Sequence, residues 1–243
     1  MAKTVNSAFD EFMKNSVNLD SDRTVKAKSS RDWLVGQILS FPDNDSDFPA
    51  IYTEKNIFYG SFARKTKKRP LDDIDMMIVL KAQGCTYLEY TDRIEITVPD
   101  TSTQFKKLCS DNTSLLNSKK LINLLVKDLK GVSQYENADI KRNQEAATLK
   151  LISYEWNFDV VPCFFTTEDP LGKTYYIIPD GNGNWKKTDP RLDRDRTANV
   201  NSSKNGRVLG VIRAIKYWNK RATMPSMGSY LLENMILDYY ENN

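Results

Sequence analysis

The stretch FYGSFARKTKKRPLDDIDMMIVL, residues 58–80, decides the fold of this chain. It opens with a glycine and a serine, Gly60 and Ser61, and ends with three aspartates that lead directly into an unbroken apolar run. Such a run is typical of a buried strand. Because side chains alternate along a strand, Asp73 and Asp75 are expected to project from one face while the residues between them face the other way.

Two carboxylates that face one point raise each other's pKa unless a cation neutralises them, and a divalent cation bound through oxygen is the obvious counter-charge. A third carboxylate, Asp159, lies in the β-prone segment 158–165 and could complete the site from another strand. The alternatives are that Asp73 is the solvated end of a strand, the role we assign to Asp72, and that Asp159 pairs with a buried lysine. Three carboxylates around two Mg²⁺ ions form the site of polymerases, which need no histidine base.

The Gly-Ser pair supplies the remaining part of such a site. A glycine lets the backbone approach a phosphate closely, and a following helical turn offers N–H groups to an anion. We therefore expect Gly60 and Ser61 to hold a triphosphate beside the metal, the alternative being an ordinary turn. The basic run at residues 65–69 lacks interleaved aromatic residues and is interpreted as a solvated loop rather than a nucleic-acid patch.

The composition excludes several kinds of chemistry. The 243 residues include no histidine, which removes Ser-His-Asp and Cys-His catalysis, and the three cysteines share no zinc-binding spacing. No segment reaches the roughly 18 to 20 apolar residues of a membrane span, and no signal peptide is seen, so we expect a cytoplasmic protein without a membrane partner. The net charge of +3 suits an anionic small substrate and gives no strong sign of direct DNA or RNA binding.

Periodicity predicts an α+β fold, with a mixed sheet and helices followed by a helical lobe. Hairpins are expected from residues 87–90 with 93–98 and from 147–154 with 158–165. Helices are expected at 5–13, at 33–39 behind a start at 29–32, at 115–130 with a stop at Gly131, at 208–218, and from Ser229 onward. The segments 179–184 and 185–205 are interpreted as a loop and a charged connection.

Two residues near the C-terminus are also candidates for a phosphate site. Val208, Val211, Ile212 and Ile215 define the apolar face of a helix. We expect Lys216, with Arg213 and Lys220, on the opposite face, the alternative to a functional role being an exposed basic face. Ser229 is interpreted as a helix N-cap, and the same helix start attracts phosphate.

These segments together resemble the DNA polymerase β-like nucleotidyltransferase superfamily, and more closely the bacterial cGAS/DncV-like nucleotidyltransferases. This group, the CD-NTases or SMODS group, makes cyclic oligonucleotide signals in anti-phage defence. The resemblance covers most of the chain and is carried by Gly60–Arg64 with Thr66, Leu71–Met77, Phe158–Pro162, Ile178–Asp180, Trp185, Asp189–Pro190, Ile212–Asn219 and Ser229–Glu233.

The resemblance implies a bilobal fold with the active site in the cleft between a catalytic core, residues 1–175, and a helical nucleotide-binding lobe, residues 176–243. It implies that Asp73, Asp75 and Asp159 are the catalytic metal ligands for two Mg²⁺ ions, with Mn²⁺ as a substitute. The implied activity is synthesis of a cyclic di- or trinucleotide second messenger from nucleoside triphosphates such as ATP and GTP, with release of pyrophosphate.

The resemblance also implies roles for the nucleotide-binding residues. Ser61, after Gly60, corresponds to the donor triphosphate contact. Lys216 and Ser229 correspond to a second set of phosphate contacts, and Tyr230 falls where relatives stack an aromatic ring on a nucleobase.

Two features depart from the family pattern. Lys65 stands where many relatives have glycine, and the chain ends at Asn243, whereas relatives usually continue with further helices, so the chain is either partial or has a small lobe. The alternative functions are another template-independent nucleotidyltransferase, of the oligoadenylate or poly(A) type or one that modifies a protein or small molecule, and a non-catalytic nucleotide or RNA binder. The bases, ring size and linkage are left open, as is activation by a partner protein or peptide.

Overall fold

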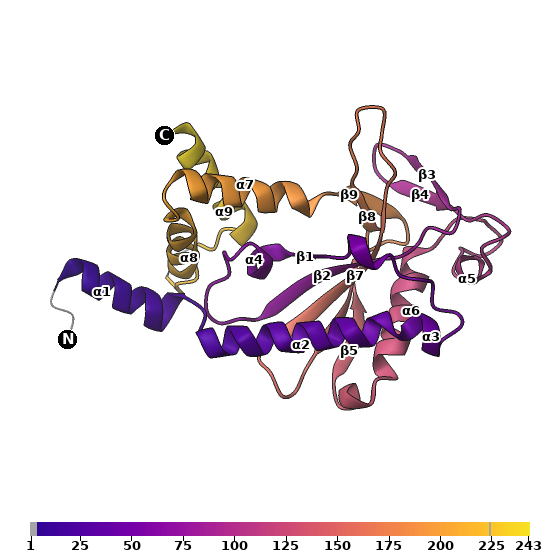
Figure 1. The fold of residues 1–243 in the computed structure, drawn as a ribbon, viewed down its shortest axis with the longest axis horizontal. Helices are drawn as coiled ribbons and strands as arrows, with labels where there is room; N and C mark the ends of the chain where they lie inside the picture. The colour runs from indigo at the N-terminus through magenta and orange to yellow at the C-terminus, as the bar shows by residue number, and fades with distance from the viewer. Residues whose placement is uncertain (1–3, 224) are drawn as a thin grey trace. The chain divides into compact units, whose positions relative to one another are not determined.

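The computed structural model describes residues 4–223 and 225–243, which form a nine-stranded sheet and a set of helices (Figure 1). These residues divide into two compact units that are each discontinuous in sequence. Unit 1 runs to Ser29 and also contains Tyr59–Asp72 and Pro190–Asn243, while unit 2 contains Ser30–Phe58 and Asp73–Asp189.

The sheet is mixed and mostly antiparallel, as expected. Its strand order is β1-β2-β7-β8-β9-β4-β3, with β5 joined through β6 to β7. Strands β2 and β7 pair in parallel, and β7 pairs antiparallel with both β6 and β8. The strands are β1 Ile57–Tyr59, β2 Asp73–Val79, β3 Thr86–Glu89, β4 Ile94–Thr97, β5 Asp139–Asn143, β6 Ala146–Lys150, β7 Asn157–Phe165, β8 Tyr176–Pro179 and β9 Trp185–Thr188.

The core of unit 2 lies around the two parallel strands and the helix α6, Ser118–Lys130. In β2 and β7 the residues after the aspartates are buried almost without interruption, which explains the long apolar runs of the sequence. Helix α6 packs against β5, β6 and β7. The Asn117 side chain accepts hydrogen bonds from the first turn of α6, and Gly131 is its C-cap, so the predicted helix and its stop are confirmed.

Unit 1 is helical and has its own small core. Its C-terminal helices are α7 Pro190–Ser203, α8 Val208–Asn219 and α9 Ser229–Asn242, which lie together in Figure 1. They bury a cluster made of Val200, Val208, Ile212, Ile236 and Leu237. The other helical elements are α1 Val5–Phe12, the π-helix η1 Met13–Val17, α2 Ser21–Leu39, α3 Phe41–Asn44, the 3₁₀ turn η2 Thr53–Lys55, α4 Gly60–Ala63, α5 Thr103–Lys106 and the 3₁₀ turn η3 Ser133–Tyr135. No helix of residues 4–223 and 225–243 is long and apolar enough to cross a membrane.

Several elements differ from the sequence expectation, among them β6, which ends at Lys150 whereas the expected strand continued to residue 154. Helix α2 begins at Ser21, eight residues before the expected start at Ser29, and the charged segment after Thr188 is the helix α7. Only Pro190, Thr197 and Val200 of α7 are buried, so the segment carries little apolar periodicity. Strands β8 and β9 form a hairpin that pairs with β7, which keeps residues 176–188 with the sheet rather than with the helical unit.

The carboxyl group of Asp128, on α6, makes the stability of the protein depend on pH. Asp128 lies beside Asp45, whose carboxylate accepts a hydrogen bond from Lys127 Nζ at 2.7 Å. Burial, together with the charge of Asp45, raises the pKa of Asp128 to about 6. Because the pKa of Asp128 is higher in the folded than in the unfolded protein, ionisation of this carboxyl destabilises the fold. The stability that the protonated carboxyl contributes is fully present below the ordinary pKa of 3.8 and is lost as pH rises through about 6.

We therefore expect Asp128→Asn to stabilise the protein at pH 8, by on the order of 1–2 kcal/mol after allowance for partial solvent screening, and to have little effect at pH 4. Urea denaturation of both proteins at the two pH values measures the difference. Asp43→Asn, at an exposed position, is the control. An equal effect of Asp128→Asn at both pH values would refute this account.

Candidate active site

The three predicted catalytic aspartates all lie in unit 2, on one face of the sheet. The parallel register pairs Asp75 of β2 with Asp159 of β7, and pairs Asp73 with Asn157. The aspartates are half-buried, while their strand neighbours Ile74, Met76, Phe158 and Val160, which face the other side of the sheet, are buried. The β2–β7 register therefore brings the carboxylates of two strands to the same edge of the apolar core.

A hydroxyl group that the sequence analysis missed orients one of these carboxylates. Thr148 of β6 is the register partner of Asp159, and its Oγ1 donates a hydrogen bond to Asp159 Oδ1 at 2.6 Å. The hairpin expected from residues 147–154 and 158–165 did not indicate this pairing, because β6 ends at Lys150 and the observed register differs from the one that a strand to residue 154 would give. The other carboxylate oxygen, Asp159 Oδ2, takes no part in this hydrogen bond.

The chemistry of this set fits a divalent cation, since Mg²⁺ prefers carboxylate oxygens. In the part of the chain that the structure describes, no three Asp, Glu or Cys side chains already converge as a group of metal ligands. The strand register puts Asp73, Asp75 and Asp159 on one face, so rotation of their side chains would be needed to bring the oxygens to one ion.

If Asp159 binds a divalent cation, Thr148→Val should lower the metal-dependent activity of this site about 10- to 100-fold, because partners of metal ligands have effects of this size. Valine keeps the shape of threonine, so the strand pairing and the thermal stability should change little. Steady-state kinetics over a range of Mg²⁺ concentrations would show a higher metal requirement. An unchanged Mg²⁺ dependence would show that Thr148 does not orient a metal ligand.

The Gly-Ser pair lies in unit 1, at the start of the short helix α4. Gly60 has φ 72°, a conformation that favours glycine, and its carbonyl accepts a hydrogen bond from Arg64 N at 3.1 Å. The Ser61 carbonyl accepts from Thr66 N at 2.9 Å and Lys67 N at 3.0 Å, which closes the turn. Lys65 has φ 62°, a left-handed conformation that favours glycine, so the lysine occupies a position whose backbone would suit a glycine.

Lys216 does not lie on the helix face that we expected. It is only 4% exposed and follows Val208 and Ile212 at four-residue intervals, so it shares their buried face. The expectation of a basic face opposite the apolar one was therefore wrong for Lys216. Lys220 is exposed as the C-cap residue of the helix, while Arg213 donates hydrogen bonds to Asn18 Oδ1 at 2.8 Å and to the Lys65 carbonyl at 2.7 Å.

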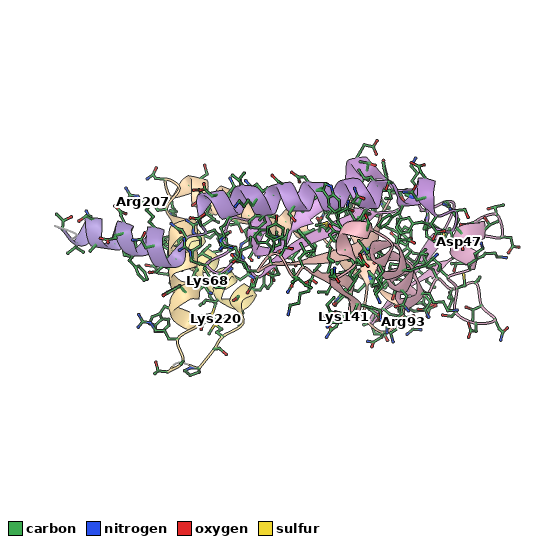
Figure 2. The ribbon with its side chains drawn as sticks, turned by 90° about the horizontal axis from the view of Figure 1, so that it is seen from below. Asp47, Lys68, Arg93, Lys141, Arg207 and Lys220 are labelled. Atoms are coloured by element: carbon green, nitrogen blue, oxygen red, sulfur yellow. The ribbon has the colours of Figure 1, made fainter. Side chains whose placement is uncertain are left out.

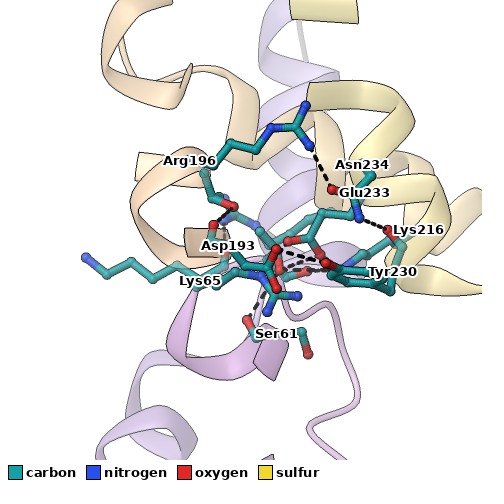
Figure 3. Close-up of polar contacts among 12 residues, drawn as sticks. Ser61, Lys65, Asp193, Arg196, Lys216, Tyr230, Glu233 and Asn234 are labelled. Atoms are coloured by element: carbon teal, nitrogen blue, oxygen red, sulfur yellow. Dashed lines mark hydrogen bonds and ion pairs between the residues drawn. The ribbon is translucent and has the colours of Figure 1, made fainter. Parts of the chain in front are cut away.

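Lys216 belongs to a cluster of buried and nearly buried polar side chains in unit 1, which we call the Glu233 cluster: Arg64, Thr66, Lys216 and Glu233. Figure 3 labels Lys216 and Glu233. Glu233, 2% exposed, forms an ion pair with Lys216 Nζ and accepts hydrogen bonds from Arg64 Nε at 2.7 Å and Thr66 Oγ1 at 3.0 Å. Burial acts to raise the pKa of Glu233, but Arg64 and Lys216 outweigh it and lower the pKa. Burial also lowers the pKa of Lys216, against the attraction of Glu233.

The start of α9 differs in one detail from the expectation. Gly228 is the N-cap of this helix, so Ser229 is its first residue rather than the cap.

The next residue, Tyr230, is 55% exposed, and its hydroxyl donates a hydrogen bond to Asp193 Oδ1 at 2.8 Å. The Arg64 guanidinium lies 5.8 Å from the centre of its ring. Tyr230 therefore presents a fixed and accessible aromatic surface.

Part of the basic run has a structural role. Arg69 donates hydrogen bonds to the carbonyls of Asn18 at 3.0 Å and Asn15 at 2.9 Å, and Lys67 forms an ion pair with the largely exposed Asp72. Figure 2 shows Lys68 near Lys220; burial lowers the pKa of Lys68, and the charge of Lys220 acts in the same direction. The run is thus a partly anchored loop rather than a fully solvated one.

Comparison with known proteins shows the family. No protein-family model matches the chain. A protein of Bacillus cereus (strain VD146), named as a probable cyclic nucleotide synthase, is 51% identical over 243 residues, which are 100% of this chain and 73% of that protein. The chain belongs to the CD-NTase family of cyclic nucleotide synthases.

Solved structures show that this CD-NTase has the fold of its family. The chain of Escherichia coli MS115-1 CdnC with ATP matches with a TM-score of 0.62 and 17% identity, over 97% of this chain and 65% of CdnC. The CdnC:HORMA-deltaN complex matches with the same TM-score and identity, over 96% and 64%. The CD-NTase described here thus spans slightly less than two thirds of the CdnC chains.

Proposed function

We propose that this CD-NTase joins nucleoside triphosphates into a cyclic di- or trinucleotide second messenger, with release of pyrophosphate, in bacterial anti-phage signalling. The observation that carries the proposal is the β2–β7 register, in which Asp75 is paired with Asp159 and Asp73 shares their face. The name of the Bacillus cereus relative supports the same activity.

In this proposal Asp73, Asp75 and Asp159 would hold two Mg²⁺ ions, with Mn²⁺ as a substitute. Bound there, the ions would acidify the attacking sugar hydroxyl and stabilise the leaving pyrophosphate. Thr148 supports this role of Asp159, because its hydroxyl fixes one carboxylate oxygen through the 2.6 Å hydrogen bond. The half-buried position of the aspartates limits access of water to the carboxylates and strengthens their attraction to a cation.

The residues of unit 1 would bind the nucleotides. Gly60 and Ser61 would contact the donor triphosphate, since the φ 72° of Gly60 leaves the backbone open to a close approach. Lys216 and Ser229 would supply the second set of phosphate contacts. Tyr230 would stack on a base, because its ring is exposed and its hydroxyl is anchored by Asp193.

We extend two features of CdnC to this CD-NTase. CdnC has been solved with ATP and in a complex with HORMA-deltaN, and we propose that this chain likewise takes nucleoside triphosphates and is activated by a partner protein in the cytoplasm.

The test is an analysis of reaction products. The protein is incubated with all four ribonucleoside triphosphates and Mg²⁺ or Mn²⁺, treated with phosphatase and analysed by mass spectrometry, beside an Asp73→Ala/Asp75→Ala control. We expect a phosphatase-resistant product with the mass of a cyclic di- or trinucleotide that is absent from the control. Linear products, or products that form only with an added acceptor, would replace the proposal by another nucleotidyltransferase activity.

A further inference from the structure

The Glu233 cluster joins three segments of unit 1 that are distant in the sequence. Arg64 and Thr66 follow the Gly-Ser turn, Lys216 lies on α8, and Glu233 lies on α9. The Glu233 carboxylate contacts all three of the other side chains, with Oε1 bound to Arg64 and Oε2 bound to both Thr66 and Lys216. The carboxylate is therefore the centre of the cluster.

The cluster is charged although it is buried. Two cations surround one carboxylate, and the lowered pKa of Glu233 keeps the carboxylate ionised at neutral pH. A buried ion pair is weak evidence for stability, because desolvation offsets most of the attraction. What an ion pair with several hydrogen bonds does provide is a defined geometry for the groups that it holds.

The Glu233 cluster connects both proposed sets of phosphate contacts, the Gly60–Ser61 turn and the pair formed by Lys216 and Ser229. Thr66 N donates to the Ser61 carbonyl at 2.9 Å while Thr66 Oγ1 donates to Glu233, so one residue links the Gly-Ser turn to α9. Ser229 precedes Glu233 by four residues on α9, which places both on one side of the helix. The same carboxylate holds Lys216 Nζ.

We propose that Glu233 is a positioning residue for triphosphate binding, holding Lys216 and the turn that carries Ser61 in the arrangement that the phosphates require. This inference rests on the proposed function of the site. Glu233 does not itself contact the nucleotide in this proposal, because its carboxylate oxygens are already bound to Arg64, Thr66 and Lys216.

The sign of the effect of Glu233→Gln separates this role from a simple electrostatic one. Removal of a negative charge near a phosphate site would, by Coulomb attraction alone, tighten ATP binding. If Glu233 positions Lys216, its removal weakens binding instead. We expect the KM for ATP, and the Kd measured with a fluorescent ATP analogue, to rise by at least about tenfold, which is the size typical of an outer supporting residue.

A pH profile supplies a second readout that loss of packing alone would not change. The charged groups that act on Lys216 are Glu233, Arg64 and Lys67, and of these only Glu233 favours the charged lysine. Without the carboxylate, burial and the two cations all act to deprotonate Lys216. The Kd of Glu233→Gln, divided by that of the wild type at the same pH, should therefore increase between about pH 6 and pH 9.

The matched control is Glu241→Gln, which removes a carboxylate from the same helix at a more exposed position, where Glu241 pairs with Arg196. This variant should keep the wild-type Kd. Glu233→Asp keeps the charge but shortens the side chain, and its Kd should lie between those of the wild type and Glu233→Gln. Circular dichroism and thermal melts check that each variant folds, and Glu233→Asp carries the test if Glu233→Gln does not fold.

The outcomes distinguish failure of the positioning role of Glu233 from failure of the proposed function. A Kd of Glu233→Gln, or of Glu233→Asp where that variant carries the test, equal to or below the wild-type value would overturn the positioning role while leaving the proposed function intact. A wild-type protein that neither binds a triphosphate nor makes a product would instead overturn the proposed function. Weaker, pH-dependent binding by the Glu233 variants with unchanged binding by Glu241→Gln would support the inference.

Discussion

Asp75→Asn is expected to abolish nucleotidyl transfer, with a loss in kcat/KM of at least about 10³-fold. Asp75 is the direct register partner of Asp159 and lies two residues from Asp73, so it occupies the middle of the carboxylate set. Asparagine has nearly the same shape but lacks the charge that attracts a divalent cation. The fold should be retained, and the loss should appear in pyrophosphate release measured under saturating Mg²⁺.

Asp72→Asn is the control for this prediction. Asp72 belongs to the same run of three aspartates, but its side chain is 66% exposed and pairs with Lys67 at the surface. Its substitution should change the activity by less than about threefold, as expected for a solvated ion pair. Equal activities of Asp75→Asn and Asp72→Asn would show that the face shared with Asp159 has no catalytic role.

Lys216→Ala should lower the free energy of unfolding of the protein by about 2–3 kcal/mol, because a buried carboxylate loses one of its two cationic partners. The carboxylate is that of Glu233, which would remain bound to Arg64 and Thr66 but would lose its ion pair with the lysine. For a chain of this size, the melting temperature should fall by roughly 5–10 °C. Triphosphate binding should weaken as well, through loss of the Nζ contact that we propose.

Lys220→Ala provides the comparison, since Lys220 is exposed and is the C-cap residue of the same helix. Differential scanning calorimetry of the two variants should show a large shift for Lys216→Ala and almost none for Lys220→Ala. A melting temperature of Lys216→Ala within about 2 °C of the wild type would contradict the account of the ion pair.

The parts of the fold that the sequence predicted correctly are those with strong local patterns. The apolar run after Asp75 became part of β2, and α6 ended at the glycine that was expected to stop it. Both expected hairpins formed, although β6 ends at Lys150 instead of residue 154. Helix α7 was missed because its 14 residues are mostly charged and polar. Part of what fixes it lies elsewhere in the chain: Arg196 bonds Asn234 and Glu241 of α9.

The candidate site was predictable to a similar extent. Alternation along a strand was enough to place Asp73 and Asp75 on one face, because this period is a property of the backbone. The sequence could not show that Thr148 bonds Asp159 or that Lys216 is buried against Glu233. Both depend on which segments meet in three dimensions, and neither a threonine in a strand nor a lysine in a helix carries a local signal of its partner.

The central claim is that the three carboxylates on the β2–β7 face hold divalent cations for nucleotidyl transfer. Crystals of the protein grown with Mn²⁺ and a non-hydrolysable ATP analogue would test it most directly, through anomalous diffraction at the manganese edge. The account predicts two Mn²⁺ peaks about 3.5–4 Å apart, bound by Asp73, Asp75 and Asp159. A bound nucleotide with no Mn²⁺ at these carboxylates would contradict it.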